Sequence, residues 1–173
     1  MQWTVLAVLA TMALALRAAD ALPGLFASVP RGVHVCASVA EAESRTGIGL
    51  APLLRGLAGY RPVTGGIRTT STPAPAVSLT MRQGEAGDAK LAAFRTQGAE
   101  IPASLRSPLP AFHEIEISME RGRAGTLHAA TMADGSVWQD LEWSDGDGRT
   151  ALRFGGRTVE LLGLARRIVE GSR

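Results

Sequence analysis

Apolar and polar residues alternate along several stretches of this chain, and the alternation is most regular between residues 137 and 143. Leu141 and Trp143 fall on one face of this segment, whereas Asp140 and Glu142 fall on the other. A period of two is that of a β-strand with one buried face. Residues 144–148 follow with two Asp-Gly pairs, which supply the positive φ of a hairpin turn. The pattern therefore predicts a strand and a tight turn into a second strand.

Alternation and β-branched residues also predict the other strands. In chain order these are 33–37, 67–72, 77–82, 90–96, 112–120 and 126–132, and the return strand of the hairpin ends at residue 154. Residues 90–96 contain Leu-Ala-Ala-Phe, which is also compatible with a helix. Residues 101–110 hold three prolines and are predicted to form a surface loop. Short glycine-containing turns join the last four strands, which predicts an antiparallel meander.

Helical periodicity is confined to two segments. Ser38 and Glu41 form a capping box ahead of a short helix at 39–46. Thr158 is predicted to cap a second helix, in which apolar residues recur at helical spacing at Leu161, Leu162, Ala165, Ile168 and Val169. The predicted fold class is α+β. We expect one curved antiparallel sheet, a meander of about six strands, with the short N-terminal helix and the C-terminal helix packed on one face.

The length and charge of the chain limit the number of domains and the classes of partner that are expected. A chain of 173 residues with 46% hydrophobic residues fits one domain with a short appendage. We assign residues 1–21 to a signal peptide or membrane anchor, 22–32 to a linker and 33–173 to a single domain. The net charge is only +2 and the arginines are dispersed, so no nucleic-acid partner is expected. The lone cysteine, Cys36, excludes an internal disulfide and is predicted to be a buried thiol.

The first segment has the character of an export signal. Residues 4–16 carry no charge, and the run is shorter than the roughly 20 residues that span a bilayer. Ala19 and Ala21 form a small-x-small cleavage pattern before Leu22. However, no basic residue precedes the apolar run, and Arg17 follows it. Three interpretations stay open: a cleaved signal, a retained membrane anchor, and a buried helix. The predicted localisation is exported or membrane-anchored, and extracytoplasmic.

Catalytic and metal-binding patterns are weak in this sequence. Glu114 and Glu116 share one strand face, about 7 Å apart, as a carboxylate pair for acid–base catalysis would. His113 and His128 would meet across a hairpin, as two zinc ligands would. Yet no nucleophile motif or phosphate-binding loop is found, and the neighbours of the glutamates indicate a solvated face. We therefore predict no catalytic residues, no metal and no cofactor.

Trp138 is the candidate binding residue, together with Glu114 and Glu116. By alternation its side chain points away from Leu141 and Trp143, and hence away from the predicted core. If that face of the sheet is open, the residue exposes an aromatic ring of the kind that marks binding surfaces. If the connector at 48–54 covers that face, Trp138 is part of the core. The sequence leaves both alternatives open.

Several short motifs carry a resemblance to a known family. In chain order they are Ser-Val-Ala-Glu-Ala at 38–42, Gly-Ile-Gly-Leu-Ala-Pro at 47–52, Leu-Ala-Gly-Tyr at 57–60, Val-Ser-Leu-Thr-Met at 77–81, Leu-Glu-Trp at 141–143, Ala-Leu-Arg-Phe-Gly-Gly at 151–156 and Leu-Leu-Gly-Leu-Ala at 161–165. With this order the chain resembles a bacterial extracytoplasmic domain family of unknown function. Its members often follow a membrane segment in anti-sigma-factor-like proteins, and others are exported. No sigma-binding domain precedes the apolar segment here, so an anti-sigma role of the chain itself is not expected.

The resemblance implies an extracytoplasmic sensing or binding module and supplies no catalytic residues. We therefore expect a non-enzymatic envelope protein that binds another envelope protein or an apolar ligand. A carrier of a lipid-like ligand, held between sheet and helix, is the first alternative, and it requires a cavity above about 300 Å³. A hydrolase that uses Glu114 and Glu116 is the second, and it requires those carboxylates to lie in a cleft.

Overall fold

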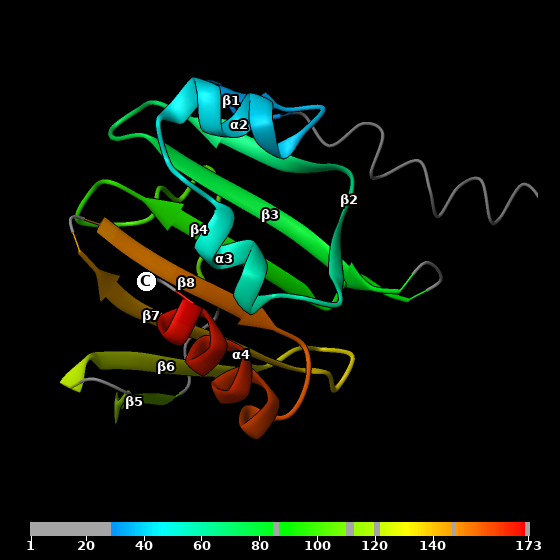
Figure 1. Cartoon of the computed structure of the whole chain (residues 1–173). Helices are drawn as coiled ribbons and strands as arrows, with labels where there is room; N and C mark the ends of the chain where they lie inside the picture. The colour runs from blue at the N-terminus through cyan, green and yellow to red at the C-terminus, as the bar shows by residue number, and fades with distance from the viewer. Residues whose placement is uncertain (1–28, 85–86, 110–112, 120–121, 147, 172–173) are drawn as a thin grey trace, which may run out of the picture. The chain divides into compact units, whose positions relative to one another are not determined.

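The computed structural model describes residues 29–84, 87–109, 113–119, 122–146 and 148–171. The described residues from Arg31 onward belong to one compact unit. An antiparallel sheet of eight strands forms one layer, and three helices cover one of its faces (Figure 1). The predicted α+β class and the antiparallel sheet are confirmed. Residues 1–21 and most of the predicted linker lie outside the described residues.

The sheet consists of two four-stranded meanders. The strands are β1 (Val33–Val35), β2 (Tyr60–Thr70), β3 (Ala76–Gln83), β4 (Leu91–Thr96), β5 (His113–Ser118), β6 (Ala124–Thr131), β7 (Val137–Asp145) and β8 (Gly148–Phe154), in the order β1-β2-β3-β4-β8-β7-β6-β5. The two meanders join where β4 pairs with β8, for example Ala93 with Leu152. The predicted single meander of about six strands is therefore wrong, because β4 pairs with the last strand and not with the next one.

Local chemistry accounts for the ends of the helices. In α2 (Val39–Thr46) the Ser38 hydroxyl accepts a hydrogen bond from the Glu41 amide, and the Glu41 carboxylate accepts one from the Ala37 amide. The predicted capping box is thus confirmed. In α4 (Thr158–Gly171) the amides of Glu160 and Leu161 donate to the Arg157 carbonyl. The helix therefore begins at Thr158 itself, and the prediction of Thr158 as its cap is wrong.

The core lies between the sheet and the helices. One row of side chains crosses the sheet on the helix side, through Leu79, Ala93, Leu152, Leu141 and Leu127, as the strand register dictates. The stripe of α4 that contains Leu161, Ile168 and Val169 packs on this row. A short helix, α3 (Ala51–Gly56), lies beside α4 on the same side of the sheet. The 48–54 connector, part of which is α3, therefore belongs to the helix side and does not cover the face on which Trp138 lies.

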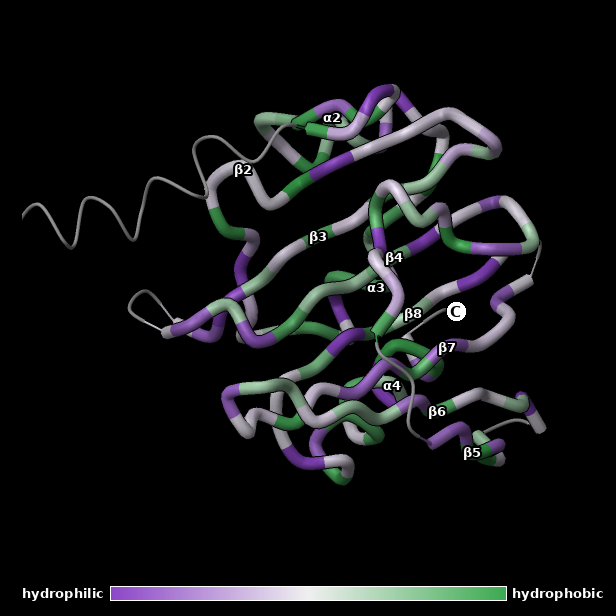
Figure 2. Tube along the Cα trace, turned by 180° about the vertical axis from the view of Figure 1, so that it is seen from behind, coloured by the Kyte–Doolittle hydropathy of each residue, from purple (hydrophilic) through white to green (hydrophobic). Residues whose placement is uncertain are grey.

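Residues 97–109 cover part of the other face, which Figure 2 shows from behind. Ile101 packs on Phe94 and Ala151 and forms a small second core with them. The segment is irregular, as its prolines predict, but Ile101 and Pro102 are buried. The predicted loop is therefore present, and its first residue is anchored in this second core. The segment connects β4, in the middle of the sheet, to β5 at its edge.

Candidate functional site

Trp138 lies near the start of β7, on the face of the sheet that the helices leave free. Its register partner is Ala130 of β6, and the alternation places it on the same side as Asp140 and Glu142. The indole is half-buried, because one of its sides packs against Gly155. A Cβ atom at Gly155 would lie 3.2–3.3 Å from three atoms of the ring. Glycine at this position therefore allows the β8–α4 connection to approach the indole closely.

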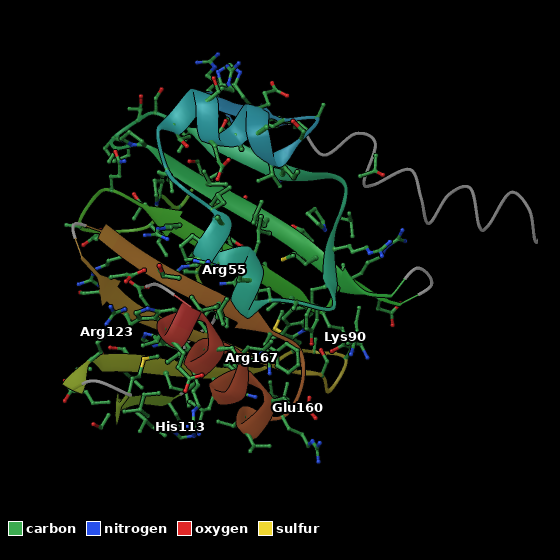
Figure 3. The ribbon with its side chains drawn as sticks, viewed as in Figure 1. Arg55, Lys90, His113, Arg123, Glu160 and Arg167 are labelled. Carbon is green, nitrogen blue, oxygen red and sulfur yellow. The ribbon has the colours of Figure 1, made fainter. Side chains whose placement is uncertain are left out.

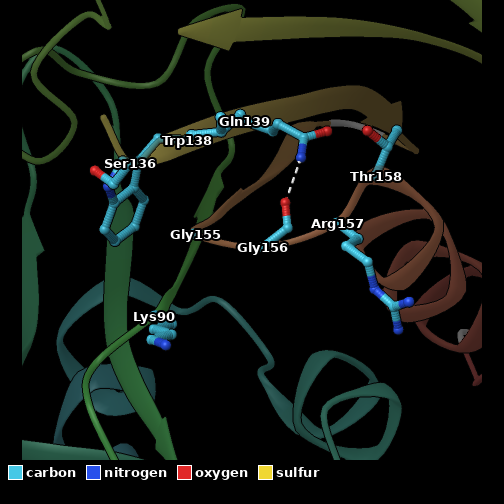
Figure 4. Close-up of a pocket in the computed structure, with 9 residues that line it drawn as sticks. Lys90, Ser136, Trp138, Gln139, Gly155, Gly156, Arg157 and Thr158 are labelled. Carbon is cyan, nitrogen blue, oxygen red and sulfur yellow. Dashed lines mark hydrogen bonds between the residues drawn. The ribbon is translucent and has the colours of Figure 1, made fainter. Parts of the chain in front are cut away.

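Trp138 lines a hollow of about 650 Å³ at the end of the sheet (Figure 4). The walls come from three segments: the turn before β7 and its first residues, the connection from β8 to α4, and Lys90 just before β4. The lining residues are Lys90, Ser136, Val137, Trp138, Gln139, Gly155, Gly156, Arg157 and Thr158. Lys90 is far from the others in the sequence, and only the pairing of β4 with β8 brings it to this site.

Two hydrogen bonds hold the glycine pair that forms the floor of this hollow. The Gly155 amide donates to the Lys90 carbonyl at 2.8 Å, and the Gln139 side-chain amide donates to the Gly156 carbonyl at 2.6 Å. Gln139 is only 3% exposed, and its buried Oε1 atom has no hydrogen-bond partner among the described residues. The connection is therefore held by a hydrogen bond at each glycine.

Two cationic side chains line this hollow, and they differ in whether they form an ion pair. Arg157 forms an exposed ion pair with Glu160, one turn further along α4. Lys90 is exposed and forms no ion pair with any described residue. Figure 3 shows Lys90 and Glu160 at the same end of the molecule, opposite the end at which Arg123 lies. Lys90, without an ion-pair partner among the described residues, lines the same hollow as the indole of Trp138. This combination favours a ligand that carries both an acidic and an apolar group.

A second hollow, of about 460 Å³, lies at the opposite end of the sheet. Arg95 and Arg123 both reach it, but each forms an ion pair with Asp145 at 3.5 Å and 2.7 Å. Arg95 also donates to the Gly49 carbonyl. Both arginines are already engaged by Asp145, so this hollow offers a ligand fewer free charges than the one at Trp138.

Glu114 and Glu116 lie on β5, the strand at one edge of the sheet. Both side chains are exposed, opposite His128 and Thr126 of β6. The register places them on the same face as Trp138, but the Trp138 hollow does not include them. The structure thus brings the three predicted residues to one face without joining them in one pocket. Neither glutamate lies in a cleft of the kind a hydrolytic carboxylate pair requires.

The sequence analysis missed a network of ion pairs on the same face. Arg153 donates to both carboxylate oxygens of Asp140, each at 2.7 Å, and Glu142 pairs with Arg106 and Arg149. Burial alone raises the pKa of Glu142, but the guanidiniums of Arg149 and Arg106 outweigh it and hold the pKa below its usual value of 4.5. Each of the two carboxylates is paired with at least one guanidinium, so the network stabilises the fold.

The alternation within the β7–β8 hairpin contained a signal for this network. Asp140 and Glu142 share one face of β7, and Arg149 and Arg153 share one face of β8. The tight turn fixes the register, and it sets Asp140 directly opposite Arg153. Arg106, in contrast, arrives from the 97–109 segment and could not have been assigned from sequence spacing.

The histidines and Cys36 have structural positions. His113 lies opposite Ala129 on the helix side, whereas His128 lies opposite Glu114 on the other side, so the two do not face each other. Within the described residues no group of three His, Cys, Asp or Glu side chains is arranged to hold a metal ion. Cys36 is buried beside the Thr69 hydroxyl, as predicted for a core thiol. The predicted cleavage residues, Ala19 and Ala21, lie outside the described residues.

Comparisons with known proteins found no significant similarity. No model of a known protein family matches the chain, and neither a curated protein nor a solved structure is significantly similar to it. Among the helices that the structure describes, none combines the length and the hydropathy required to cross a bilayer. The family resemblance therefore stays a prediction, and the assignment of a site rests on the geometry around Trp138.

Proposed function

We propose that residues 33–173 form a non-enzymatic binding module of the bacterial cell envelope, and that the hollow at Trp138 is its ligand site. One observation carries this proposal. A half-exposed indole, backed by Gly155, lines a hollow of about 650 Å³. Lys90, which forms no ion pair with a described residue, lines the same hollow. Ligand pockets in proteins measure about 300–1,000 Å³ and combine apolar walls with a few placed polar groups.

The chemistry of the walls defines the ligand class. The exposed side of the indole offers an apolar, aromatic surface, which stacks well on another ring. Lys90 offers a charge to a carboxylate, sulfonate or phosphate. The site therefore fits a small anionic amphiphile, or a loop of another envelope protein that presents an aromatic ring next to an acidic group.

The two alternative functions have less support. A lipid carrier requires a cavity between sheet and helix, but large buried side chains such as Trp143, Leu141 and Leu161 fill this layer. The hollow between α4 and β5 measures about 150 Å³, below the size of a typical ligand site. A hydrolase requires an enclosed carboxylate pair, and Glu114 and Glu116 are exposed on an edge strand.

Binding of an anionic aromatic probe tests the ligand site. The full-length protein is titrated with anilinonaphthalene sulfonate, and the dissociation constant is read from the fluorescence of the probe. Trp138→Ala removes the stacking surface and is expected to raise the dissociation constant about tenfold. Lys90→Met removes the charge from an exposed position, where it should leave folding intact, and is expected to raise the constant about threefold.

Val159→Ala is the matched control, since Val159 is 68% exposed on α4 and does not line the hollow. Its dissociation constant should equal that of the wild type. Any binding of the probe to the apolar N-terminal segment is common to all variants and cancels in the comparison. Equal affinity of the wild type, Trp138→Ala and Lys90→Met would remove the hollow as a ligand site.

The proposed compartment has a separate test. The protein is recovered from fractionated cells and its N-terminus is sequenced. A mature start at Leu22 in the envelope fraction agrees with cleavage after Ala21, and an intact N-terminus in the membrane fraction agrees with an anchor. Recovery of the intact protein from the soluble cytosol would overturn the envelope assignment.

A further inference from the structure

The outer edge of β5 is a second surface with recognition chemistry of its own. β5 spans six residues at one end of the sheet, whereas β1, at the other end, spans only three. Among the described strands only β6 pairs with β5, so its other edge presents unpaired backbone amides and carbonyls. Such an edge is a template for an additional strand.

Beyond His113, the helix side of this edge presents apolar residues from β5. Ile115 is 54% exposed, although it belongs to the face that is buried elsewhere in the sheet. Next to it, a groove of about 150 Å³ runs between β5 and α4, lined by residues that include Ile117, Met119 and Leu162. Leu162 is itself 38% exposed. A strand added to β5 would therefore cover apolar surface that α4 leaves uncovered.

The opposite side of this edge is acidic. Glu114 and Glu116 are exposed there, and neither forms an ion pair with a described residue. This differs from the neighbouring strands, where Asp140 and Glu142 are paired with arginines. A strand added to β5 would place a side chain directly opposite each glutamate, about 5 Å away. Basic side chains suit both positions.

The register argues against a second copy of this chain as the added strand. When the β5 strands of two copies pair antiparallel about a two-fold axis, each residue lies opposite a residue that points to the same face of the sheet. In the registers with the greatest overlap, Glu116 therefore lies opposite Glu116, or Glu114 lies opposite Glu116. Like charges that face each other across a strand pair destabilise it. Glutamates on an edge strand thus oppose self-association, and they favour a partner of opposite charge.

We propose that the β5 edge binds an extended segment of a partner protein in which basic and apolar residues alternate. The basic residues lie opposite Glu114 and Glu116, and the apolar residues lie opposite Ile115 and Ile117, beside the groove with α4. Backbone hydrogen bonds hold the segment, and the alternation specifies its face and register. This surface is separate from the hollow at Trp138, and the inference does not depend on the ligand proposed there.

A fluorescent peptide in which lysine and valine alternate serves as the probe, with the full-length protein and fluorescence anisotropy as the readout. A peptide in which glutamate and valine alternate is its charge-reversed counterpart. We expect the lysine peptide to bind. The dissociation constant of the glutamate peptide should be at least about tenfold higher. The double variant Glu114→Lys/Glu116→Lys should reverse this preference.

Asp88→Lys/Glu100→Lys is the matched control, because it changes the net charge equally at exposed positions outside β5 and outside its groove with α4. It should keep the preference of the wild type, and so should Trp138→Ala. Equal effects of the two double variants would indicate attraction by net charge alone and would overturn the inference.

Backbone pairing has its own readout. Two lysine–valine peptides are compared, one methylated on the amides of the odd residues and one on those of the even residues. In a paired strand only alternate amides face the neighbouring strand. One methylated peptide should therefore lose binding and the other should keep it. If both bind as the parent peptide does, or if both fail to bind, no strand is added to β5.

Discussion

At the scale of single residues, the charged side chains on the face of the sheet opposite the helices differ in whether they form ion pairs. Asp140 is buried and Glu142 is half-buried, and arginines hold both. In contrast, Glu114, Glu116 and Lys90 are exposed without an ion-pair partner among the described residues. The paired groups stabilise the fold. The unpaired groups lie next to the two surfaces for which we propose partners.

Glu142 makes the stability of the protein sensitive to acid. Its pKa is lowered in the folded state, so the folded protein binds fewer protons there than the unfolded chain does. The stabilising contribution is therefore complete above the usual value of 4.5 and is lost as the pH falls through the lower, folded-state pKa. Glu142→Gln should lower the free energy of unfolding by about 1–2 kcal/mol at pH 7 and by less at pH 3.5. Urea unfolding at the two pH values measures this.

Glu170→Gln is the control for this prediction. Glu170 forms an exposed ion pair with Arg166 within α4, and such pairs contribute little. The stability of this variant should follow that of the wild type at both pH values. A loss of stability in Glu142→Gln that is the same at pH 7 and pH 3.5 would contradict the assigned role of Glu142.

At the scale of elements, the packing of α3 on α4 depends on one glycine. A Cβ atom at Gly56 would lie 2.6 Å from the backbone N and Cα atoms of Ile168, so the two helix backbones nearly touch. Gly56→Ala should push the helices apart and lower the free energy of unfolding by about 1–3 kcal/mol. Denaturant unfolding measures the change.

Gly163→Ala is the matched control within α4. Apart from the adjacent residues and the backbone of the helix itself, no described atom lies within 4 Å of a Cβ atom at this position. Alanine favours a helix over glycine by up to about 1 kcal/mol. This variant should therefore be slightly more stable than the wild type. Equal destabilisation by both substitutions would show that the contact with Ile168 is not the cause.

Elements that depend on local patterns were predicted from the sequence, whereas pairing between distant strands was not. The alternation at 137–143, the Asp-Gly turn and the box of Ser38 and Glu41 are local patterns, and they predicted β7, the hairpin and α2 correctly. The pairing of β4 with β8 left no local pattern, because it joins strands more than 50 residues apart. The single-meander prediction failed for this reason.

The candidate site, too, was predicted from the sequence only in part. The orientation of Trp138 away from the core followed from alternation and is confirmed by the register. The hollow itself also required Lys90, which the non-local pairing of β4 with β8 brings to Trp138. Likewise, the alternation at 113–118 predicted which way Glu114 faces, but only the strand order shows that β5 is an edge.

At the scale of the whole molecule, the two meanders share one core through β4 and β8. These strands pair on both sides, and their residues Ala93 and Leu152 are fully buried. Native-state hydrogen exchange should therefore be slowest for the amides of β4 and β8, and faster for β5, which opens locally. Exchange followed by mass spectrometry or NMR measures the order. Protection of β5 equal to that of β8 would indicate that its outer edge is already covered.

The strand order also sets a distance. β1 and β5 are the two edges of the sheet, and seven strand spacings of about 4.8 Å separate them by roughly 34 Å. The chain enters the sheet at β1, directly after residue 31, whereas the edge proposed to take a partner strand is β5. When the N-terminal segment serves as a tether, the domain acts as a spacer. A segment captured at β5 is then held a full sheet width from the point of attachment, which gives a partner room to approach.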